Sequence, residues 1–149
     1  MDQDLTILVA DDDENDVILL QRALLKNAIV NSVQVCCNGQ QAIDYLSGSE
    51  PYSDRKKHPF PSIVFLDLKM PRKSGLDVLQ WLKAHPECHV IPVIMLTSSR
   101  EETDITQAYK LGANSYIVKP LDFSEFRIMI KTVCDYWTWC EKPKMPPRC

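Results

Sequence analysis

Acidic, hydroxyl and basic side chains stand where short apolar segments of this sequence end. The residues are Asp11, Asp12, Asp67, Thr97 and Lys119. Two carboxylates about 4 Å apart repel each other by about 4 kcal/mol at an effective dielectric constant of about 20, so a group of three takes up protons or shares a cation. An all-oxygen ligand set suits Mg²⁺ or Mn²⁺. If the fold brings these carboxylates together, the sequence predicts a divalent-metal site.

Phosphoryl transfer is the chemistry that this set of residues supports. Beside a metal ion, we expect the Asp67 carboxylate to attack phosphorus as a nucleophile. The metal ion and the Lys119 ammonium group would offset charge on the transferred oxygens, and the Thr97 hydroxyl group can donate a hydrogen bond to one of them. A single aspartate after an apolar segment is commonly a helix cap or a turn residue. The prediction therefore depends on all of these residues meeting at one place.

Five apolar segments rich in Val and Ile are expected to form strands, at 5–10, 32–37, 63–68, 91–96 and 114–118. Three of them are nearly continuous in apolar residues, as in strands that are covered on both faces. Amphipathic segments follow the strands and predict helices at 17–26, 39–46, 75–84, 101–110 and 123–139. Asp13 and Asn38 stand where the first two helices need N-caps, and Gly112 stands where the fourth helix ends.

Strict alternation of strand and helix predicts a parallel sheet with right-handed crossovers and helices on both faces. The expected fold is a flavodoxin-like (βα)5 α/β sandwich with strand order 2-1-3-4-5. Ligands of such sheets bind outside the carboxyl ends of the strands, so the candidate residues should converge on one edge. We expect one domain over 4–139, with an extended loop at 47–61 and a flexible C-terminal tail at 140–149.

Charge and composition exclude several classes of function. The net charge of −3 and the pI near 5.6 provide no basic field for nucleic acid, so we expect no direct nucleic-acid partner. No apolar run approaches the roughly 20 residues that a membrane span requires, so a cytoplasmic protein without membrane insertion is expected. Six cysteines form neither a CxxC pair nor a zinc-ligand spacing and are predicted to be reduced thiols.

Four motifs together resemble the receiver domains of response regulators in two-component signalling. That family has an acidic pair after the first strand, an acceptor aspartate, a Thr or Ser after the fourth strand and a Lys-Pro after the fifth. The corresponding segments here are LVADD at 8–12, FLDLKMPRKSG at 65–75, LTSS at 96–99 and YIVKP at 116–120. The resemblance covers residues 4–139, and the combination of motifs is specific although each motif alone is weak.

The resemblance implies a metal-binding role for four of these residues. Asp12 and Asp67 would bind Mg²⁺ through their carboxylates, Asp11 mostly through water, and Lys69 through its backbone carbonyl group. Many receivers have Asn or Met two residues after the acceptor, where this chain has Lys69. We therefore predict that the Lys69 ammonium group changes the lifetime of the phosphoryl group without changing which residue accepts it.

The resemblance also implies how the phosphoryl group arrives and what it changes. A sensor histidine kinase would donate it to Asp67, and the protein would assist its own phosphorylation and dephosphorylation without being an enzyme. Thr97 and Tyr116 would form a switch pair. The Lys119–Pro120 peptide bond is expected to be cis, an isomer largely confined to proline.

Within the family, the loop at 47–61 and the ending VCDYWTWCEKPKMPP are most similar to single-domain regulators paired with cyanobacterial phytochromes and related sensor kinases. A stand-alone regulator with a phytochrome-like kinase partner is therefore expected. Its output face would comprise the segments 101–110, 114–118 and 123–139. Tyr136, Trp137 and Trp139 near the end of that face are aromatic residues of the kind that anchor interfaces, and we expect a homodimer there.

Three other functions are compatible with parts of the sequence. A haloacid-dehalogenase-type phosphatase also uses an aspartate nucleophile and Mg²⁺, but it requires a second Asp where this chain has Lys69. A flavin or nucleotide carrier is possible on fold alone, although the four glycines form no phosphate-binding loop. A binding module that has lost phosphorylation would retain the fold, and Mg²⁺-dependent labelling by a small phosphodonor would distinguish it.

Overall fold

The computed structural model describes residues 5–26 and 30–141. Its strands are β1 (Leu5–Ala10), β2 (Val30–Cys36), β3 (Ile63–Leu66), β4 (Val93–Thr97) and β5 (Ser115–Val118). Its helices are α1 (Glu14–Leu25), α2 (Gly39–Ser47), α3 (Gly75–Ala84), α4 (Glu102–Lys110) and α5 (Phe123–Trp139). All strand pairs are parallel and the order is β2-β1-β3-β4-β5, which confirms the expected flavodoxin-like fold.

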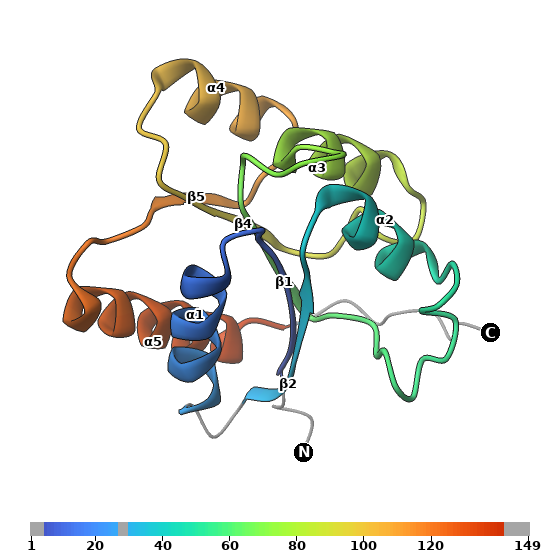
Figure 1. Ribbon diagram of the computed structural model, residues 1–149, viewed down its shortest axis with the longest axis horizontal. Helices are drawn as coiled ribbons and strands as arrows, with labels where there is room; N and C mark the ends of the chain where they lie inside the picture. The colour runs from blue at the N-terminus through green and yellow to red at the C-terminus, as the bar shows by residue number, and fades with distance from the viewer. Residues whose placement is uncertain (1–4, 27–29, 142–149) are drawn as a thin grey trace.

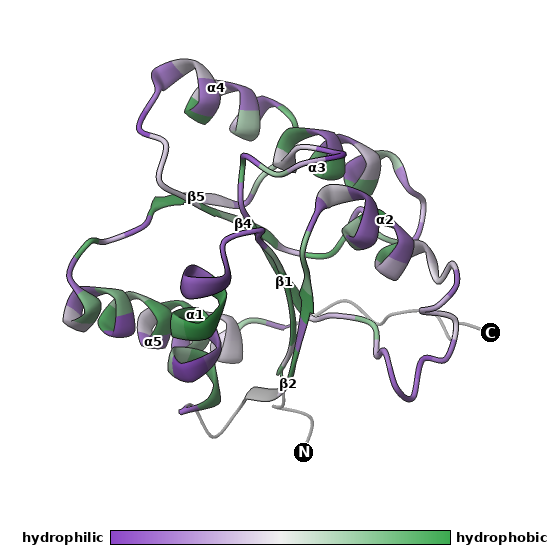
Figure 2. Cartoon of the chain, viewed as in Figure 1, coloured by the Kyte–Doolittle hydropathy of each residue, from purple (hydrophilic) through white to green (hydrophobic). Residues whose placement is uncertain are grey.

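Helices cover both faces of the sheet. Figure 1 shows α1 and α5 side by side on one face, and α2, α3 and α4 on the other. Figure 2 shows mostly hydrophobic strands in the middle of the molecule and a hydrophilic segment between β1 and α1. Among the described residues, no helix combines the length and apolar character needed to cross a membrane.

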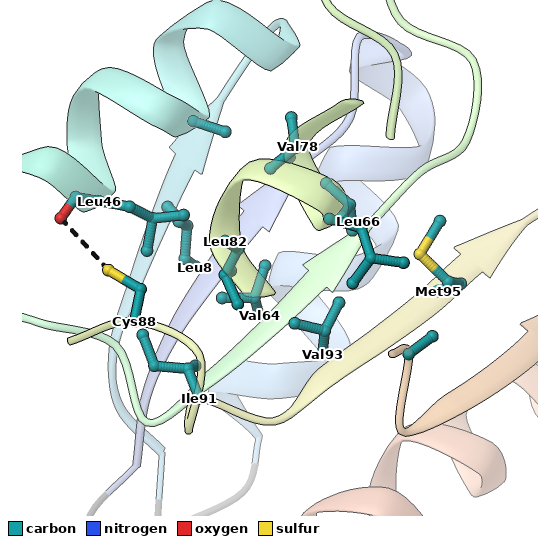
Figure 3. Close-up of a cluster of buried hydrophobic side chains, with 14 of the residues drawn as sticks. Leu8, Leu46, Val64, Leu66, Val78, Leu82, Cys88, Ile91, Val93 and Met95 are labelled. Atoms are coloured by element: carbon teal, nitrogen blue, oxygen red, sulfur yellow. Dashed lines mark hydrogen bonds between the residues drawn. The ribbon is translucent and has the colours of Figure 1, made fainter. Parts of the chain in front are cut away.

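Two separate apolar cores result from the alternation of side chains along each strand. In β1, Leu8 and Ala10 face the core under α2, α3 and α4, whereas Ile7 and Val9 face the core under α1 and α5. The first core is drawn in Figure 3, where the Cys88 thiol approaches the carbonyl oxygen of Leu46 at 3.8 Å. Because both faces of the central strands are buried, the backbone that carries the strand-end residues is packed tightly on both sides.

The helix starts follow local capping chemistry. Asp13 caps α1 by accepting hydrogen bonds from the N–H groups of Asn15 and Asp16, and Asn38 caps α2 by accepting from the N–H group of Gln41. The Asp13 cap places the start of α1 at Glu14, three residues before the expected start at 17. Helices α3 and α5 have the expected bounds.

Several strand bounds differ from the expected ones for identifiable reasons. Strand β4 begins at Val93 because Pro92 has no N–H group to donate to the ladder. Strand β3 ends at Leu66, two residues early, because the chain turns into the loop that carries Asp67. Strand β2 spans Val30–Cys36 and β5 starts at Ser115. Each shift is one or two residues, which is the usual uncertainty of such boundaries.

Two further expectations change. The Lys119–Pro120 bond is trans, so the expectation of a cis bond is wrong; the cis bond among the described residues is Glu50–Pro51. An X–Pro bond prefers trans by about 0.5–1 kcal/mol unless its surroundings select cis. The loop expected to be extended folds back on α2, where Arg55 donates to the carbonyl oxygens of Leu46 and His58, both at 3.1 Å. Most of the predicted C-terminal tail, 142–149, lies outside the described residues.

Candidate functional site

Ladder hydrogen bonds place the candidate residues along one edge of the sheet. The N–H group of Asp67 donates to the carbonyl oxygen of Ala10 at 2.9 Å, and the N–H group of Asp11 donates to that of Cys36 at 3.1 Å. The N–H group of Lys119 donates to the carbonyl oxygen of Thr97 at 2.8 Å. Backbone pairing therefore brings together residues that lie about a hundred positions apart in the sequence.

Asp11, Asp12 and Asp67 form an acidic cluster. One carboxylate oxygen from each lies within 4.8 Å of the others. Asp11 is buried, Asp67 is half-buried and Asp12 is exposed. A hard divalent cation takes oxygen ligands and keeps several waters, so three carboxylates with one open to solvent fit Mg²⁺ or Mn²⁺.

Lys119 forms ion pairs with three carboxylates of this site. Its Nζ lies 2.8 Å from Oδ2 of Asp11, 2.8 Å from Oδ2 of Asp16 and 3.6 Å from Oδ2 of Asp67. Burial alone would lower the pKa of Lys119, but the hydrogen bonds to Asp11 and Asp16 and the charge of Asp67 outweigh burial and raise it. The ammonium group therefore stays charged throughout the physiological pH range.

Burial dominates the titration of Asp67. It raises the pKa of the carboxyl group to about 6, and the charge of Asp11 adds to this increase. Lys119 is the largest opposing cause, and hydrogen bonds from the Thr97 side chain and the Leu68 N–H group also lower the pKa. The Leu68 N–H group donates to Oδ1 at 2.8 Å, so the two carboxylate oxygens have different surroundings.

The expected switch residues are connected through Ser99. Thr97 is 2% exposed, and its Oγ1 accepts a hydrogen bond from the N–H group of Ser99 at 3.4 Å. The Tyr116 hydroxyl group donates to the carbonyl oxygen of Ser99 at 3.0 Å, and its ring packs against the core under α4. The roles predicted for Thr97 and Tyr116 stay predictions, but a shift at either residue would disturb the same backbone segment.

Glycines hold the loop after the acceptor close to its neighbours. A Cβ atom on Gly75 would lie 2.1 Å from the carbonyl oxygen of Asp67, and one on Gly39 would lie 2.0 Å from that of Lys73. Both positions require the absence of a side chain. The N-terminus of α2 thus packs directly against the loop that carries Lys69, whose side chain is exposed.

The site opens into a cavity of about 470 Å³, which we call the acceptor cavity. Asp67, Thr97 and Lys119 line it, and so do the following residues: Asp12, Asp13, Asp16, Lys69, Ser98, Ser99, Arg100 and Glu101. Asp11 does not line the cavity but contacts Lys119 from below the surface. The arrangement can hold a divalent cation and a dianionic group side by side.

Asp16 is an ion-pair partner of Lys119 that the sequence did not reveal. It stands in the first turn of α1, where an acidic residue commonly interacts with the helix dipole. The available signal was weak: Asp16 is the fifth carboxylate in the segment 11–16. Only the three-dimensional structure shows that its side chain reaches Lys119, 103 positions away in the sequence.

Comparison with known proteins supports the class that the sequence motifs resemble, the receiver domains of response regulators. Residues 7–131 match the model of the response regulator receiver domain. The chain is 30% identical to the probable methanogenesis regulatory protein FilR2 of Methanothrix harundinacea over 138 residues, 92% of this chain and 86% of FilR2. It is also 30% identical to response regulator Rcp1 of Synechocystis over 131 residues, 88% of this chain and 87% of Rcp1.

Solved structures of related regulators superpose closely. The phosphorylated cyanobacterial phytochrome response regulator RcpA aligns with a TM-score of 0.88 at 30% identity, covering 95% of this chain and 99% of RcpA. The Mn²⁺-bound form of Rcp1 aligns with a TM-score of 0.82 at 29% identity, covering 96% and 99% of the two chains. This chain belongs to the response regulator receiver domain family, whose members are phosphoacceptors of two-component signalling.

Proposed function

We propose that Asp67 of this response regulator accepts a phosphoryl group from a sensor histidine kinase in a step that depends on a divalent metal ion. One observation supports this proposal: the other two carboxylates of the acidic cluster, Lys119 and Thr97 all lie around the Asp67 carboxylate. Asp11 also follows a strand and belongs to the cluster, but it is buried and does not line the acceptor cavity, whereas Asp67 lines it together with Thr97 and Lys119.

The transfer step balances without any further reactant. The N–P bond of the kinase's phosphohistidine breaks and a bond forms between phosphorus and an Asp67 carboxylate oxygen. The histidine, which carries a proton on its other ring nitrogen, leaves as neutral imidazole. Later, water attacks phosphorus and the O–P bond breaks, which releases inorganic phosphate and restores the carboxylate. The protein thus assists both reactions while being modified itself, which distinguishes it from an enzyme that turns over a substrate.

Each residue has a separate part in this step. Mg²⁺ or Mn²⁺, when bound, offsets charge on the phosphoryl oxygens and would be held by Asp12 and Asp67, by Asp11 through water and by the Lys69 carbonyl group. Lys119 offers an ammonium group that is charged and already close to Asp67. Thr97 offers a buried hydroxyl group that can turn toward a new phosphoryl oxygen.

Output is proposed to pass through α4, β5 and α5. A phosphoryl group that attracts the Thr97 hydroxyl would disturb Ser99, to which Tyr116 is hydrogen-bonded, and so bias the position of α4 against β5. On α5, Tyr136 and Trp139 are 61% and 88% exposed, whereas Trp137 packs against the second core. We propose homodimerisation through this face, with Tyr136 and Trp139 as anchors.

A phytochrome-like sensor kinase is the proposed donor. This follows from the likeness to RcpA and Rcp1, because the structure of RcpA is that of a cyanobacterial phytochrome response regulator. Phosphotransfer from a purified phytochrome kinase would be compared with transfer from an unrelated sensor kinase. Transfer at equal rates from both would contradict a phytochrome-specific pairing.

Acetyl phosphate labelling tests the acceptor. The protein is incubated with acetyl phosphate and Mg²⁺, and the modified residue is located by mass spectrometry. We expect labelling at Asp67 only, none in Asp67→Asn, and none when EDTA removes the metal ion. Full labelling of Asp67→Asn would show that another residue is the acceptor.

Light scattering tests the output face. With beryllofluoride as a mimic of the phosphoryl group, we expect the wild type to form more dimer than without it, and Trp139→Ala to dimerise less. A wild type that stays monomeric at high concentration with and without beryllofluoride would exclude the homodimer. The face would then bind a different protein.

A further inference from the structure

Lys119 has two carboxylate partners besides the acceptor, and one of them lies outside the acidic cluster. Its Nζ is 2.8 Å from Asp16, the same distance as from Asp11, and 0.8 Å closer than to Asp67 at 3.6 Å. Only 10% of the Lys119 side chain and 34% of the Asp16 side chain are exposed. This is a partly buried ion pair, in which the charges are screened less than at the surface.

The start of α1 fixes the position of Asp16. The Asp16 N–H group donates to the Asp13 side chain at 3.2 Å, and Asp13 is the N-cap of the helix. Asp13 follows Asp11 and Asp12 in a short turn, in which its own N–H group donates to the Asp11 carboxylate at 2.9 Å. The backbone that carries the cluster therefore also sets where the Asp16 carboxylate stands.

A metal ion in the cluster changes the competition for Lys119. The ion would offset the charges of Asp11 and Asp67, which are members of the cluster, but not that of Asp16. Asp16 then becomes the strongest competitor for the ammonium group. An ammonium group has three N–H donors, and any donor directed at Asp16 is unavailable to a phosphoryl oxygen.

Resting on the proposed phosphorylation of Asp67, we propose that Asp16 is a positioning residue that holds the Lys119 ammonium group away from Asp67 and thereby slows phosphoryl transfer. Lys119 can move toward the phosphoryl oxygens only by weakening a 2.8 Å ion pair. Asp16 thus sets the intrinsic rate of the reaction without touching the phosphoryl group. The pair also lines a second cavity of about 180 Å³ beside the apolar side chains Leu19, Leu121, Phe123 and Phe126.

Two variants of the same helical turn test this proposal. Asp16→Asn removes the charge while keeping the size of the side chain, and Glu14→Gln removes an exposed charge from the first turn of α1. With acetyl phosphate and saturating Mg²⁺, we expect Asp16→Asn to be phosphorylated about fivefold faster than wild type, a change typical of a partly exposed ion pair. Glu14→Gln should stay within about twofold, which accounts for the general effect of charge on an anionic donor.

A double-mutant cycle shows whether Asp16 acts through Lys119. In a Lys119→Met background, Asp16→Asn should accelerate labelling no more than Glu14→Gln does, because there is no ammonium group to release. A second measurement needs no metal ion: the NMR signal of the Lys119 ammonium group should shift in metal-free Asp16→Asn and remain in place in Glu14→Gln.

The outcomes separate this proposal from the proposed function. If wild type is not labelled by acetyl phosphate and Mg²⁺, the proposed function is wrong. If wild type is labelled but Asp16→Asn reacts at the wild-type rate or more slowly, Asp16 does not slow phosphoryl transfer. An acceleration that persists in full in the Lys119→Met background would also overturn the inference, because the effect would not depend on Lys119.

Discussion

Two partly buried lysines, one at the acceptor cavity and one at the end of α3, differ in their partners. Lys119 has three carboxylates within 3.6 Å, and its pKa is raised. Lys83 donates to two backbone carbonyl oxygens, those of His89 at 3.2 Å and Ile91 at 3.4 Å, and burial lowers its pKa. At Lys83 the two carbonyl groups do not offset the burial of the ammonium group, whereas at Lys119 the carboxylates more than offset it.

The difference separates a reactive site from a structural contact. Around Lys119, like charges are gathered at a strand edge, and an added cation or phosphoryl group can rearrange the pairs. Around Lys83, the two carbonyl groups belong to the connection between α3 and β4. The ammonium group links that connection to α3 through hydrogen bonds. Matched substitutions at the two lysines should therefore affect different properties of the protein.

Lys119→Met is expected to have the largest effect. Phosphorylation by acetyl phosphate should slow by about 10²–10³-fold, the range found when a positioned electrostatic stabiliser of a transition state is removed. Because Asp67 and the acidic cluster remain, the residual label should still map to Asp67. Stopped-flow or quenched labelling would give the rate, with Lys83→Met as the matched control at the wild-type rate. A Lys119→Met variant as fast as the control would remove the distinction between the two lysines.

Asp12→Ala should weaken Mg²⁺ binding by about tenfold or more, because a proposed direct ligand is lost. Asp12 is exposed, so its replacement should leave the fold intact. Titration of intrinsic fluorescence or of NMR shifts with Mg²⁺ would give the affinity, and Glu14→Gln would control for loss of a nearby negative charge. Unchanged Mg²⁺ affinity in Asp12→Ala would contradict the assigned ligand set.

Asp67 should make the metal-free protein less stable as pH rises. Its carboxyl group titrates near pH 4 when unfolded and near pH 6 in the folded state, so the folded state binds more protons between these values. The free energy of unfolding should therefore fall as pH rises through this window. Asp67→Asn should lose this dependence and gain about 1–3 kcal/mol at pH 7.

Urea denaturation in EDTA at several pH values would measure this effect of Asp67. Glu14→Gln, which removes an exposed carboxylate, should keep the wild-type pH dependence. If the free energy of unfolding changed with pH in the same way in wild type and in Asp67→Asn between pH 4 and pH 6, burial would not be the dominant influence on the pKa of Asp67.

The sequence predicted most of the fold and most of the members of the site. Apolar periodicity located the strands, and the rule that ligands bind at the carboxyl ends of parallel strands brought Asp11, Asp67 and Lys119 together. It did not predict that Lys119 would contact Asp16, because that choice depends on side-chain reach between α1 and β5. The sequence also did not predict that Gly39 packs closely on the loop after Asp67, because a glycine near a helix start has several explanations.

Lys83→Met should have the smallest effect, confined to stability. Removing the ammonium group removes its burial cost but leaves the carbonyl oxygens of His89 and Ile91 without this donor, and these two effects oppose each other. The aliphatic stem is kept by Met, which preserves the contact with Gly112, where a Cβ atom would lie 3.0 Å from Cγ of Lys83. We expect a change in the free energy of unfolding within about 1 kcal/mol at pH 7.

Because the folded-state pKa of Lys83 is lowered, wild type should gain stability as pH rises toward the unfolded value near 10.4, and Lys83→Met should not. Urea denaturation at neutral and alkaline pH would test this, with the exposed Lys110→Met as control. Equal pH dependence in all three proteins would show that the Lys83 ammonium group carries no burial cost, and the contrast with Lys119 would then rest on the carboxylates alone.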